Sequence, residues 1–186
     1  EQDQRTIEYK DKLGRLILKK VQIDLAPTSH HDGWLCSYYV YDLMGNLRVV
    51  MPPKAISTLR ASNNWAGSIS DSNKFGLYYL YSYDVKGRQI TKKLPGKAPE
   101  EMVYDLQDRL VASHDSLLIS QGKWLFAKYD VLGREVMTGL VTYSGTRATL
   151  QTLVDGLGNN NAVINSTSGK TGTTNAGGFP RATDGN

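Results

Sequence analysis

Apolar and polar positions alternate along most of this chain. Before Asp42, Tyr39 and Tyr41 point to one side of an extended segment, and after the turn Leu47 and Val49 again share a face. A period of two positions is what a β-strand with one better-buried face produces. The pattern predicts an all-β fold over residues 1–143.

A Tyr-Asp dipeptide recurs four times among these strands. It opens four related heptapeptides, YDLMGNL, YDVKGRQ, YDLQDRL and YDVLGRE, at residues 41–47, 83–89, 104–110 and 129–135. A fifth segment, KDKLGRL from Lys10, fits the same pattern with its tyrosine one place early, at Tyr9. Recurrence of a short motif is the signature of a repeat architecture.

The motif predicts a bulged hairpin turn. An aspartate suits the first position of a type I turn, where its carboxylate accepts a backbone N–H two residues on, and a glycine three places later takes the left-handed conformation. The fourth unit has Asp108 there, one of the few other residue types that tolerate that conformation. We therefore expect five antiparallel hairpins, with turns at 11–14, 42–45, 84–87, 105–108 and 130–133.

The residues expected to build these repeats recur at matching places. The arginine after each turn stands as Arg15, Arg88, Arg109 and Arg134, and we expect these side chains to neutralise the turn aspartates, whereas the second unit has Asn46. The repeat residues are Tyr41, Asp42, Gly45, Tyr83, Asp84, Gly87, Arg88, Tyr104, Asp105, Asp108, Arg109, Tyr129, Asp130, Gly133 and Arg134.

The spacing of the repeats leaves one ambiguity. Tyr41 and Tyr83 are 42 residues apart, twice the 21 residues that separate Tyr83 from Tyr104. Either a degenerate unit or an insertion lies between Pro52 and Leu80.

Two short helices interrupt the strands. Pro52-Pro53 ahead of Lys54–Arg60 places proline at a helix start. Between residues 144 and 158, apolar side chains at 150, 153, 154 and 157 follow helical spacing, with Ser144 or Thr146 as the cap and Gly156 or Gly158 at the end. The segment 159–186 is rich in Gly, Asn, Ser and Thr and predicts no element.

The length and charge of the chain limit the number of domains and the kinds of partner that we expect. The chain has 186 residues, which suits one domain, and its net charge of +4 is spread as +2, +1 and +1 over residues 1–60, 61–143 and 144–186. The basic residues do not form a cluster, so the charge gives no indication of a nucleic-acid partner. No apolar run reaches the length of a membrane span. The chain begins at Glu1 without an initiator Met or a signal core, as expected of a mature chain or a fragment.

Catalytic and metal-binding patterns are weak. Cys36 with His30 and His31 is the one thiol–imidazole combination, but Cys36 beside Trp34 suits a small buried residue better. His114 is expected in a turn after a strand at 110–112. It does not lie at zinc-ligand spacing from His30 and His31. Gly169-Lys170-Thr171 lacks the first glycine of a phosphate loop, and residues 155–161 lack the alternating carboxylates of a calcium loop. We predict no catalytic residue, no metal and no cofactor.

The aromatic residues are consistent with two interpretations, cross-strand packing and sugar binding. Eleven of the seventeen are tyrosines, which fit cross-strand packing on a half-buried sheet. The alternative is a surface on which sugars stack, with Trp34, Trp65 and Trp124 as candidate ligand-binding residues.

The repeats resemble the YD repeat, Tyr-Asp-x-x-Gly-Arg-Leu, of the RHS family of large bacterial surface and secreted proteins, whose repeat type is shared with the teneurins. The stretches GWLCSYYVYDLMGNLRVVMPPKA (33–55), LPGKAPEEMVYDLQDRLV (94–111) and KWLFAKYDVLGREVMTG (123–139) look like the Bacteroidetes branch of the family. The resemblance covers about residues 6–143.

This resemblance implies a wall-building role. RHS repeats wind hairpin after hairpin into a curved, twisted sheet that closes as a hollow shell, often around a toxic C-terminal segment. We expect this chain to be a non-catalytic strip of such a β-shell, secreted or on the bacterial cell surface. Its expected partners are the remaining repeats and the C-terminal segment of the parent chain. A carbohydrate-binding or adhesive module is the alternative, and open sheet edges leave self-association possible.

Overall fold

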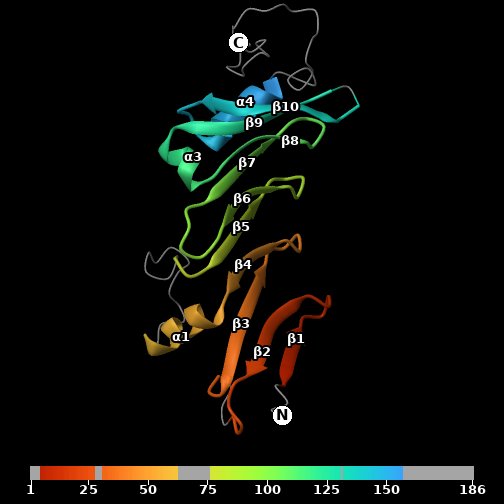
Figure 1. The fold of residues 1–186 in the computed structure, drawn as a ribbon. Helices are drawn as coiled ribbons and strands as arrows, with labels where there is room; N and C mark the ends of the chain where they lie inside the picture. Colours follow the sequence, from red (N-terminus) through yellow and green to blue (C-terminus); the bar gives the residue numbers. More distant parts are fainter. Residues whose placement is uncertain (1–4, 28–30, 63–75, 131, 157–186) are drawn as a thin grey trace, which may run out of the picture. The chain divides into compact units, whose positions relative to one another are not determined.

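The protein is an antiparallel sheet whose ten strands follow one another in chain order (Figure 1). The computed structural model describes residues 5–27, 31–62, 76–130 and 132–156. The strands are β1 Thr6–Lys10, β2 Leu16–Gln22, β3 Trp34–Tyr41, β4 Leu47–Met51, β5 Tyr79–Tyr83, β6 Gln89–Lys93, β7 Glu100–Tyr104, β8 Leu110–His114, β9 Lys123–Tyr129 and β10 Glu135–Thr142. The all-β fold of successive hairpins is confirmed.

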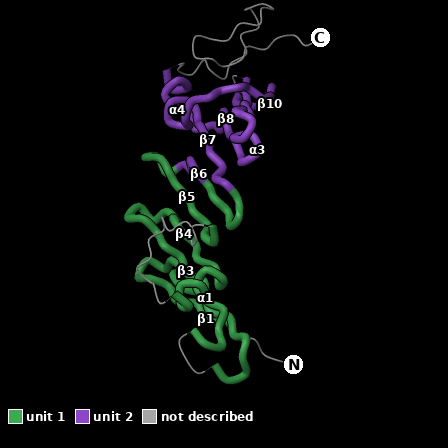
Figure 2. Tube along the Cα trace, turned by 90° about the vertical axis from the view of Figure 1, so that its left-hand side faces the viewer, with its two compact units in different colours: residues 1–87, 92–97 green, residues 88–91, 98–186 purple. Residues whose placement is uncertain are grey.

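Contacts divide the chain into two compact units, coloured separately in Figure 2. Unit 1 comprises residues 1–87 and 92–97, and unit 2 comprises residues 88–91 and 98–186. Each unit is described by itself below.

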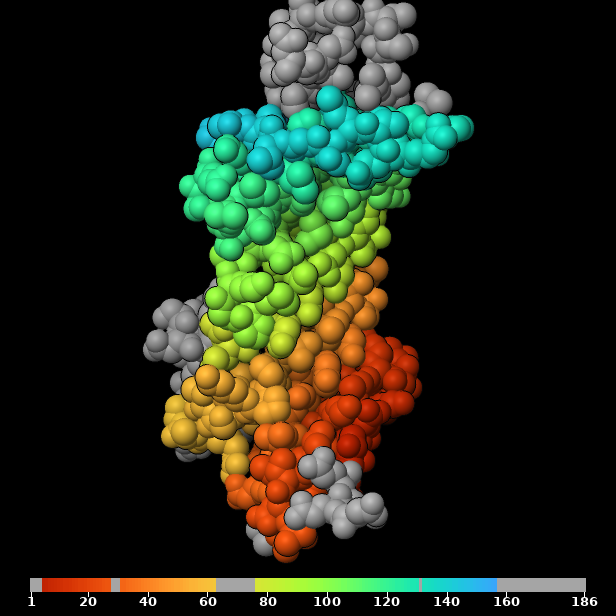
Figure 3. Space-filling view, in the orientation of Figure 1, coloured from red at the N-terminus to blue at the C-terminus, as the bar shows by residue number. Residues whose placement is uncertain are grey.

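In unit 1 a helix covers one face of the strands. β2 pairs with β3 so that Lys20 lies opposite Cys36. The helix α1, Pro53–Ala61, begins with a proline in its first turn and packs Ile56 and Leu59 against Cys36 in a buried cluster. In Figure 3 the atoms of α1 lie against those of β3 and β4.

The connection between the second and third hairpins is an insertion. β4 pairs directly with β5, with Val49 opposite Leu80 and Val50 opposite Tyr79, so no degenerate hairpin stands between these strands in the sheet. The connection contains α1, which forms a second buried cluster through Ala55 with Val49 and Tyr78. Residues 63–75 lie outside the described residues.

In unit 2 the core lies under the last helix. α4, Arg147–Gly156, starts where the sequence indicated, and Thr146 Oγ1 accepts a hydrogen bond from the Thr149 backbone N–H at 3.3 Å. The side-chain amide of Gln151 donates to the Tyr104 carbonyl at 2.6 Å and accepts from the Tyr104 N–H at 3.2 Å, which fixes the helix over β7. The buried core consists of Val103, Val111, Ala112, Trp124, Phe126, Leu150 and Val154.

Two local predictions near residue 114 were incomplete. β8 continues through His114 instead of turning after Ala112, because Glu101 of β7 pairs opposite His114. Asp115 then caps an unpredicted third helix, α3, Ser116–Ser120, by accepting hydrogen bonds from the N–H groups of Leu117 and Leu118. A five-residue helix held by its cap has too few positions to show a helical period.

Candidate functional site

The recurring feature of the molecule is the hairpin turn, and each described turn is built around its aspartate. In the turn at Asp105, Oδ1 accepts hydrogen bonds from the backbone N–H groups of Gln107 and Arg109, both at 2.9 Å. Arg109 Nε donates to Oδ2 at 2.7 Å, and the Asp108 N–H closes the turn on the Asp105 carbonyl at 3.1 Å. One carboxylate thus holds both strands of the hairpin at their junction.

The fourth turn position adopts the left-handed conformation in all five hairpins. The φ angles are 79° at Gly14, 88° at Gly45, 78° at Gly87, 63° at Asp108 and 78° at Gly133. The strand register shifts beside the turn at Tyr9/Lys10, at Val40/Tyr41 and at Val103/Tyr104, as a bulged hairpin requires.

The turns differ in how deeply the aspartate lies. The Asp105 side chain is 1% exposed and its partner Arg109 15% exposed, with Nη2 2.6 Å from Oδ2. The equivalent pair Asp130 and Arg134 has the same geometry, with Nε 2.6 Å from Oδ2, but its arginine is 73% exposed. The same Asp–Arg ion pair is therefore shielded from water in the hairpin of Asp105 and exposed to water in the hairpin of Asp130.

Arginines also reach from one hairpin to the next. The guanidinium of Arg15 lies over the ring of Tyr41 at 5.0 Å, that of Arg88 over Tyr104 at 4.8 Å, and that of Arg109 over Tyr129 at 4.9 Å. In each case the arginine of one repeat faces the tyrosine of the following repeat. Such cation–π contacts contribute about 0.5–1 kcal/mol each at exposed sites.

The same tyrosines bond to the backbone of the preceding hairpin. The hydroxyl of Tyr41 donates to the Leu16 carbonyl at 3.0 Å, that of Tyr104 to Gln89 at 2.8 Å, and that of Tyr129 to Leu110 at 2.7 Å. Each acceptor directly follows the arginine that covers the ring. We call these paired contacts the Arg–Tyr ladder: Arg15–Tyr41, Arg88–Tyr104 and Arg109–Tyr129.

The second hairpin departs from this ladder at Asn46. Its side-chain amide still donates to Asp42 Oδ2 at 3.2 Å, so the turn keeps its internal contact. An amide carries no charge to place over a ring, and within the described residues no guanidinium lies over Tyr83 of the next hairpin. Arg48 instead approaches Asp42 to 3.9 Å.

Hydrogen bonds lower the pKa of three turn aspartates. Burial by itself would raise the pKa of Asp11 and Asp42, but hydrogen bonds from Arg15 and Asn46 respectively hold it below the usual value. At Asp130 the backbone hydrogen bond from Arg134 is the largest cause of the lowered pKa. The ionised form is therefore favoured in the folded hairpin.

We expect acid to destabilise the fold through these groups. A carboxyl with a depressed folded pKa contributes stability that is present above its unfolded pKa of about 3.9 and is lost as the pH falls through the folded value. The urea midpoint should be flat near neutral pH and fall below about pH 4. The double variant Asp42→Asn, Asp130→Asn should show a shallower fall, and an unchanged slope would contradict the assignment.

The Arg–Tyr ladder makes a separate prediction. Tyr129→Phe removes the bond to the Leu110 carbonyl and should lower the free energy of unfolding by about 1 kcal/mol, measured by urea denaturation. Tyr83→Phe is the matched control, since the Tyr83 hydroxyl bonds to no other described residue. Equal losses in both variants would show that the hydroxyl bond between hairpins contributes nothing.

The candidate sugar-stacking tryptophans occupy different environments. Trp124 is 1% exposed, and its ring stacks on His114 with centroids 3.5 Å apart, so neither face can receive a sugar. Trp34 is half-buried, with Lys20 Nζ 4.7 Å from its ring centroid. Trp65 lies outside the described residues.

Among the described residues, the thiol and the imidazoles of His31 and His114 do not come together as a nucleophilic site. Cys36 is 2% exposed, and burial raises the pKa of its thiol. His31 bonds to the Tyr38 hydroxyl at 2.9 Å, His114 bonds to Glu101 at 2.7 Å, and His30 lies outside the described residues. Among the residues that the structure describes, no three His, Cys, Asp or Glu side chains gather as a metal site. None of the described helices is long and apolar enough to cross a membrane.

Sequence reasoning located the turns and missed the Arg–Tyr ladder. The arginines were expected to neutralise nearby aspartates, as Arg109 does, but their contacts with the following tyrosines depend on which hairpins are neighbours. The signal was the recurring order of Tyr, Asp and Arg, which every unit except the second carries.

The similarity of this chain to known proteins is found in solved structures. The chain matches no protein-family model and no curated protein. It does match solved structures of TcdB2-TccC3, with a TM-score of 0.55 over 76% of this chain, and of TcdB2-TccC3-TEV, with a TM-score of 0.56 over 78% of this chain, both at 16% identity. A Tc holotoxin pore of Photorhabdus luminescens with a mutated TccC3 matches with a TM-score of 0.54, also at 16% identity and over 78% of this chain.

The chain shares the fold of one segment of these matched chains. It corresponds to 6% of the length of each matched chain, so the similarity concerns one short run of hairpins in a much larger protein.

Proposed function

We propose that this chain is a non-catalytic repeat segment of a large secreted or cell-surface RHS protein. Its hairpins form part of the wall of a β-shell that encloses a C-terminal toxin or effector. The remaining repeats of the parent protein cover the two edges of this strip, and the C-terminal segment of the parent is the enclosed cargo.

The Arg–Tyr ladder is the observation that carries this proposal. Each tyrosine ring and hydroxyl of the ladder is bound by the hairpin before it, so a hairpin is complete only beside its neighbour. A unit that is bound by the preceding unit can build an extended wall by repetition. The edge strands β1 and β10 each have one unpaired side in the described sheet, where such a wall would continue.

The comparisons support the same role. The matched proteins are components of toxin complexes, and one of the matched structures is TcdB2-TccC3 without its hypervariable C-terminal region. The proposal places a variable segment of that kind after the repeats of the parent protein. It also agrees with the resemblance of the Tyr-Asp units to the RHS repeat.

Electron microscopy and proteolysis of the parent protein test the proposal together. Negative-stain images should show closed hollow particles, and the C-terminal segment should resist protease until the particles are opened by denaturant. Open or extended particles with a freely digested C-terminus would contradict encapsulation. Glycan-array binding that Trp34→Ala abolishes in a folded protein would instead support the carbohydrate-binding alternative.

A further inference from the structure

The sheet of unit 2 has a second face, opposite the one that α4 covers, which the short helix α3 borders through Leu118. Register places Val103, Ala112, Phe126 and Gly139 side by side on the face that packs under α4. Because side chains alternate along a strand, their neighbours Met102, Ser113, Leu125 and Leu140 line up across the opposite face. We call this second surface the open face.

The open face is apolar and accessible. Leu125 is 43% exposed and Leu140 is 54% exposed, although both stand in the middle of strands. Leu110, at the start of β8, is 38% exposed. Several large exposed apolar side chains on adjoining strands indicate a contact surface.

Two shallow hollows lie beside this row. One, of about 250 Å³, is bounded by Met102, Leu118 of α3 and Leu125. The other, of about 110 Å³, is bounded by Val111, Ala127 and Thr138. Both hollows are also lined by Leu110, Ser113 and Leu125, so they adjoin and form one groove across β7 to β10.

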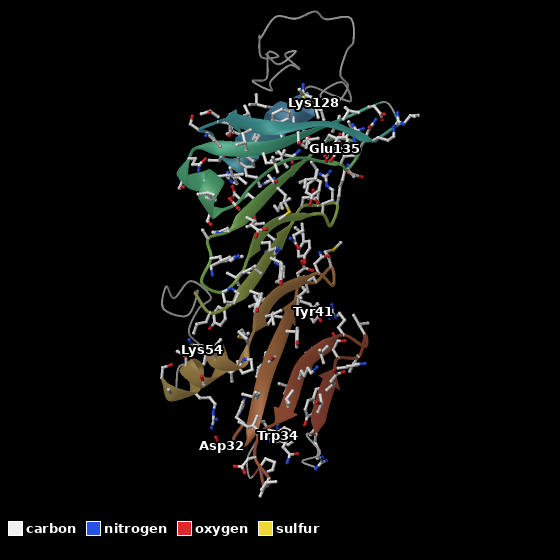
Figure 4. The ribbon with its side chains drawn as sticks, viewed as in Figure 1. Asp32, Trp34, Tyr41, Lys54, Lys128 and Glu135 are labelled. Carbon is white, nitrogen blue, oxygen red and sulfur yellow. The ribbon has the colours of Figure 1, made fainter. Side chains whose placement is uncertain are left out.

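The charged residues that line the groove include several carboxylates. Its lining includes four carboxylates, Glu100, Glu101, Asp115 and Glu135, and no lysine or arginine. Glu101 is bonded to His114 on the side of the sheet that α4 covers, and Asp115 caps α3. Glu135, labelled in Figure 4, has no ion-pair partner among the described residues and is the carboxylate of this rim on which the inference depends most. This acidic rim is notable in a chain whose net charge is +4.

We propose that the open face binds a segment of a separate polypeptide in which lysine or arginine side chains stand between apolar ones. The apolar side chains enter the groove beside Leu110 and Leu125. The cationic side chains lie their methylene stems along the groove and place their charges at the carboxylates of the rim. This inference does not rest on the proposed shell function.

A peptide titration tests the proposal with the full chain. The probe is a fluorescein-labelled decapeptide of alternating Leu and Lys, followed by fluorescence anisotropy. We expect saturable binding that weakens about tenfold between low salt and about 0.5 M salt. Decapeptides of alternating Ser and Lys, or Leu and Glu, should bind at least about tenfold more weakly, since each lacks one half of the complementarity.

Surface variants locate the site. Glu135→Lys and Leu125→Ser should each weaken binding about fivefold or more, with unchanged circular dichroism. Glu8→Lys on β1 makes the same charge change elsewhere and should leave the affinity unchanged. If a variant fails to fold, Glu135→Gln provides the milder change.

Three results would overturn the proposal. The Leu-Glu peptide could bind as tightly as the Leu-Lys peptide, which would indicate general adhesion to apolar surface. Glu8→Lys could weaken binding as much as Glu135→Lys, which would indicate non-specific attraction. Sedimentation could show a dimer that Leu125→Ser dissociates, which would indicate that the open face binds a second copy of this chain.

Discussion

Replacing Asp105 by alanine should lower the free energy of unfolding by about 3–5 kcal/mol, the largest effect expected of any turn residue. The substitution deletes a 1% exposed carboxylate and leaves the Arg109 guanidinium without its partner in a site only 15% exposed to water. It also removes the acceptor of two backbone N–H groups at the junction of β7 and β8. Urea denaturation followed by circular dichroism measures the loss.

Asp130→Ala is the matched control, because it removes the same contacts from a turn whose arginine is 73% exposed. Water can replace the lost partner there, so the loss should be much smaller. Asp105→Asn should fall between wild type and Asp105→Ala, since the amide oxygen keeps the turn acceptor while the charge is lost. Similar losses at Asp105 and Asp130 would show that burial of the ion pair does not matter.

Trp124→Ala should cost about 3–5 kcal/mol, the usual range for removing a large aromatic side chain from a core. The ring is 1% exposed and sits between the strands and α4 in the core of unit 2, stacked on His114. Truncation leaves a cavity, and α4 loses part of the surface on which Leu150 and Val154 pack. Thermal and urea unfolding should both report the change.

Trp34→Ala should have a smaller effect because that ring is half-buried and its main charged contact is Lys20. The comparison also bears on glycan binding. Any glycan affinity lost on Trp124→Ala would reflect damage to the core, whereas affinity lost on Trp34→Ala in a stable protein would report a contact. Equal stability losses at the two positions would contradict the difference in burial.

Local chemistry explains why the hairpins could be predicted. An aspartate, two variable residues and a glycine specify one turn by contacts within five residues, and Asp108 was recognised because few side chains tolerate a positive φ. The helices at 53–61 and 147–156 were recognised for similar reasons, from proline at one start and apolar spacing in the other. Each of these signals is complete within a short window of sequence.

The features that the sequence did not reveal depend on residues far apart in the chain. The stacking of His114 on Trp124 follows from the pairing of β8 with β9, and the clamp of Gln151 on Tyr104 joins residues 47 positions apart. Burial of Trp124 follows from α4, which comes after it in the chain. The open face likewise emerges only when the strand register shows which side chains share a surface.

The direction of the Arg–Tyr ladder has a consequence for biosynthesis. In every pair the arginine belongs to the earlier hairpin and the tyrosine to the later one. A hairpin leaving the ribosome therefore meets a neighbour that already presents a guanidinium and a free carbonyl, so growth can proceed in the order of translation. Sequential addition keeps contacts local and limits the time for which an unpaired strand edge is open to aggregation.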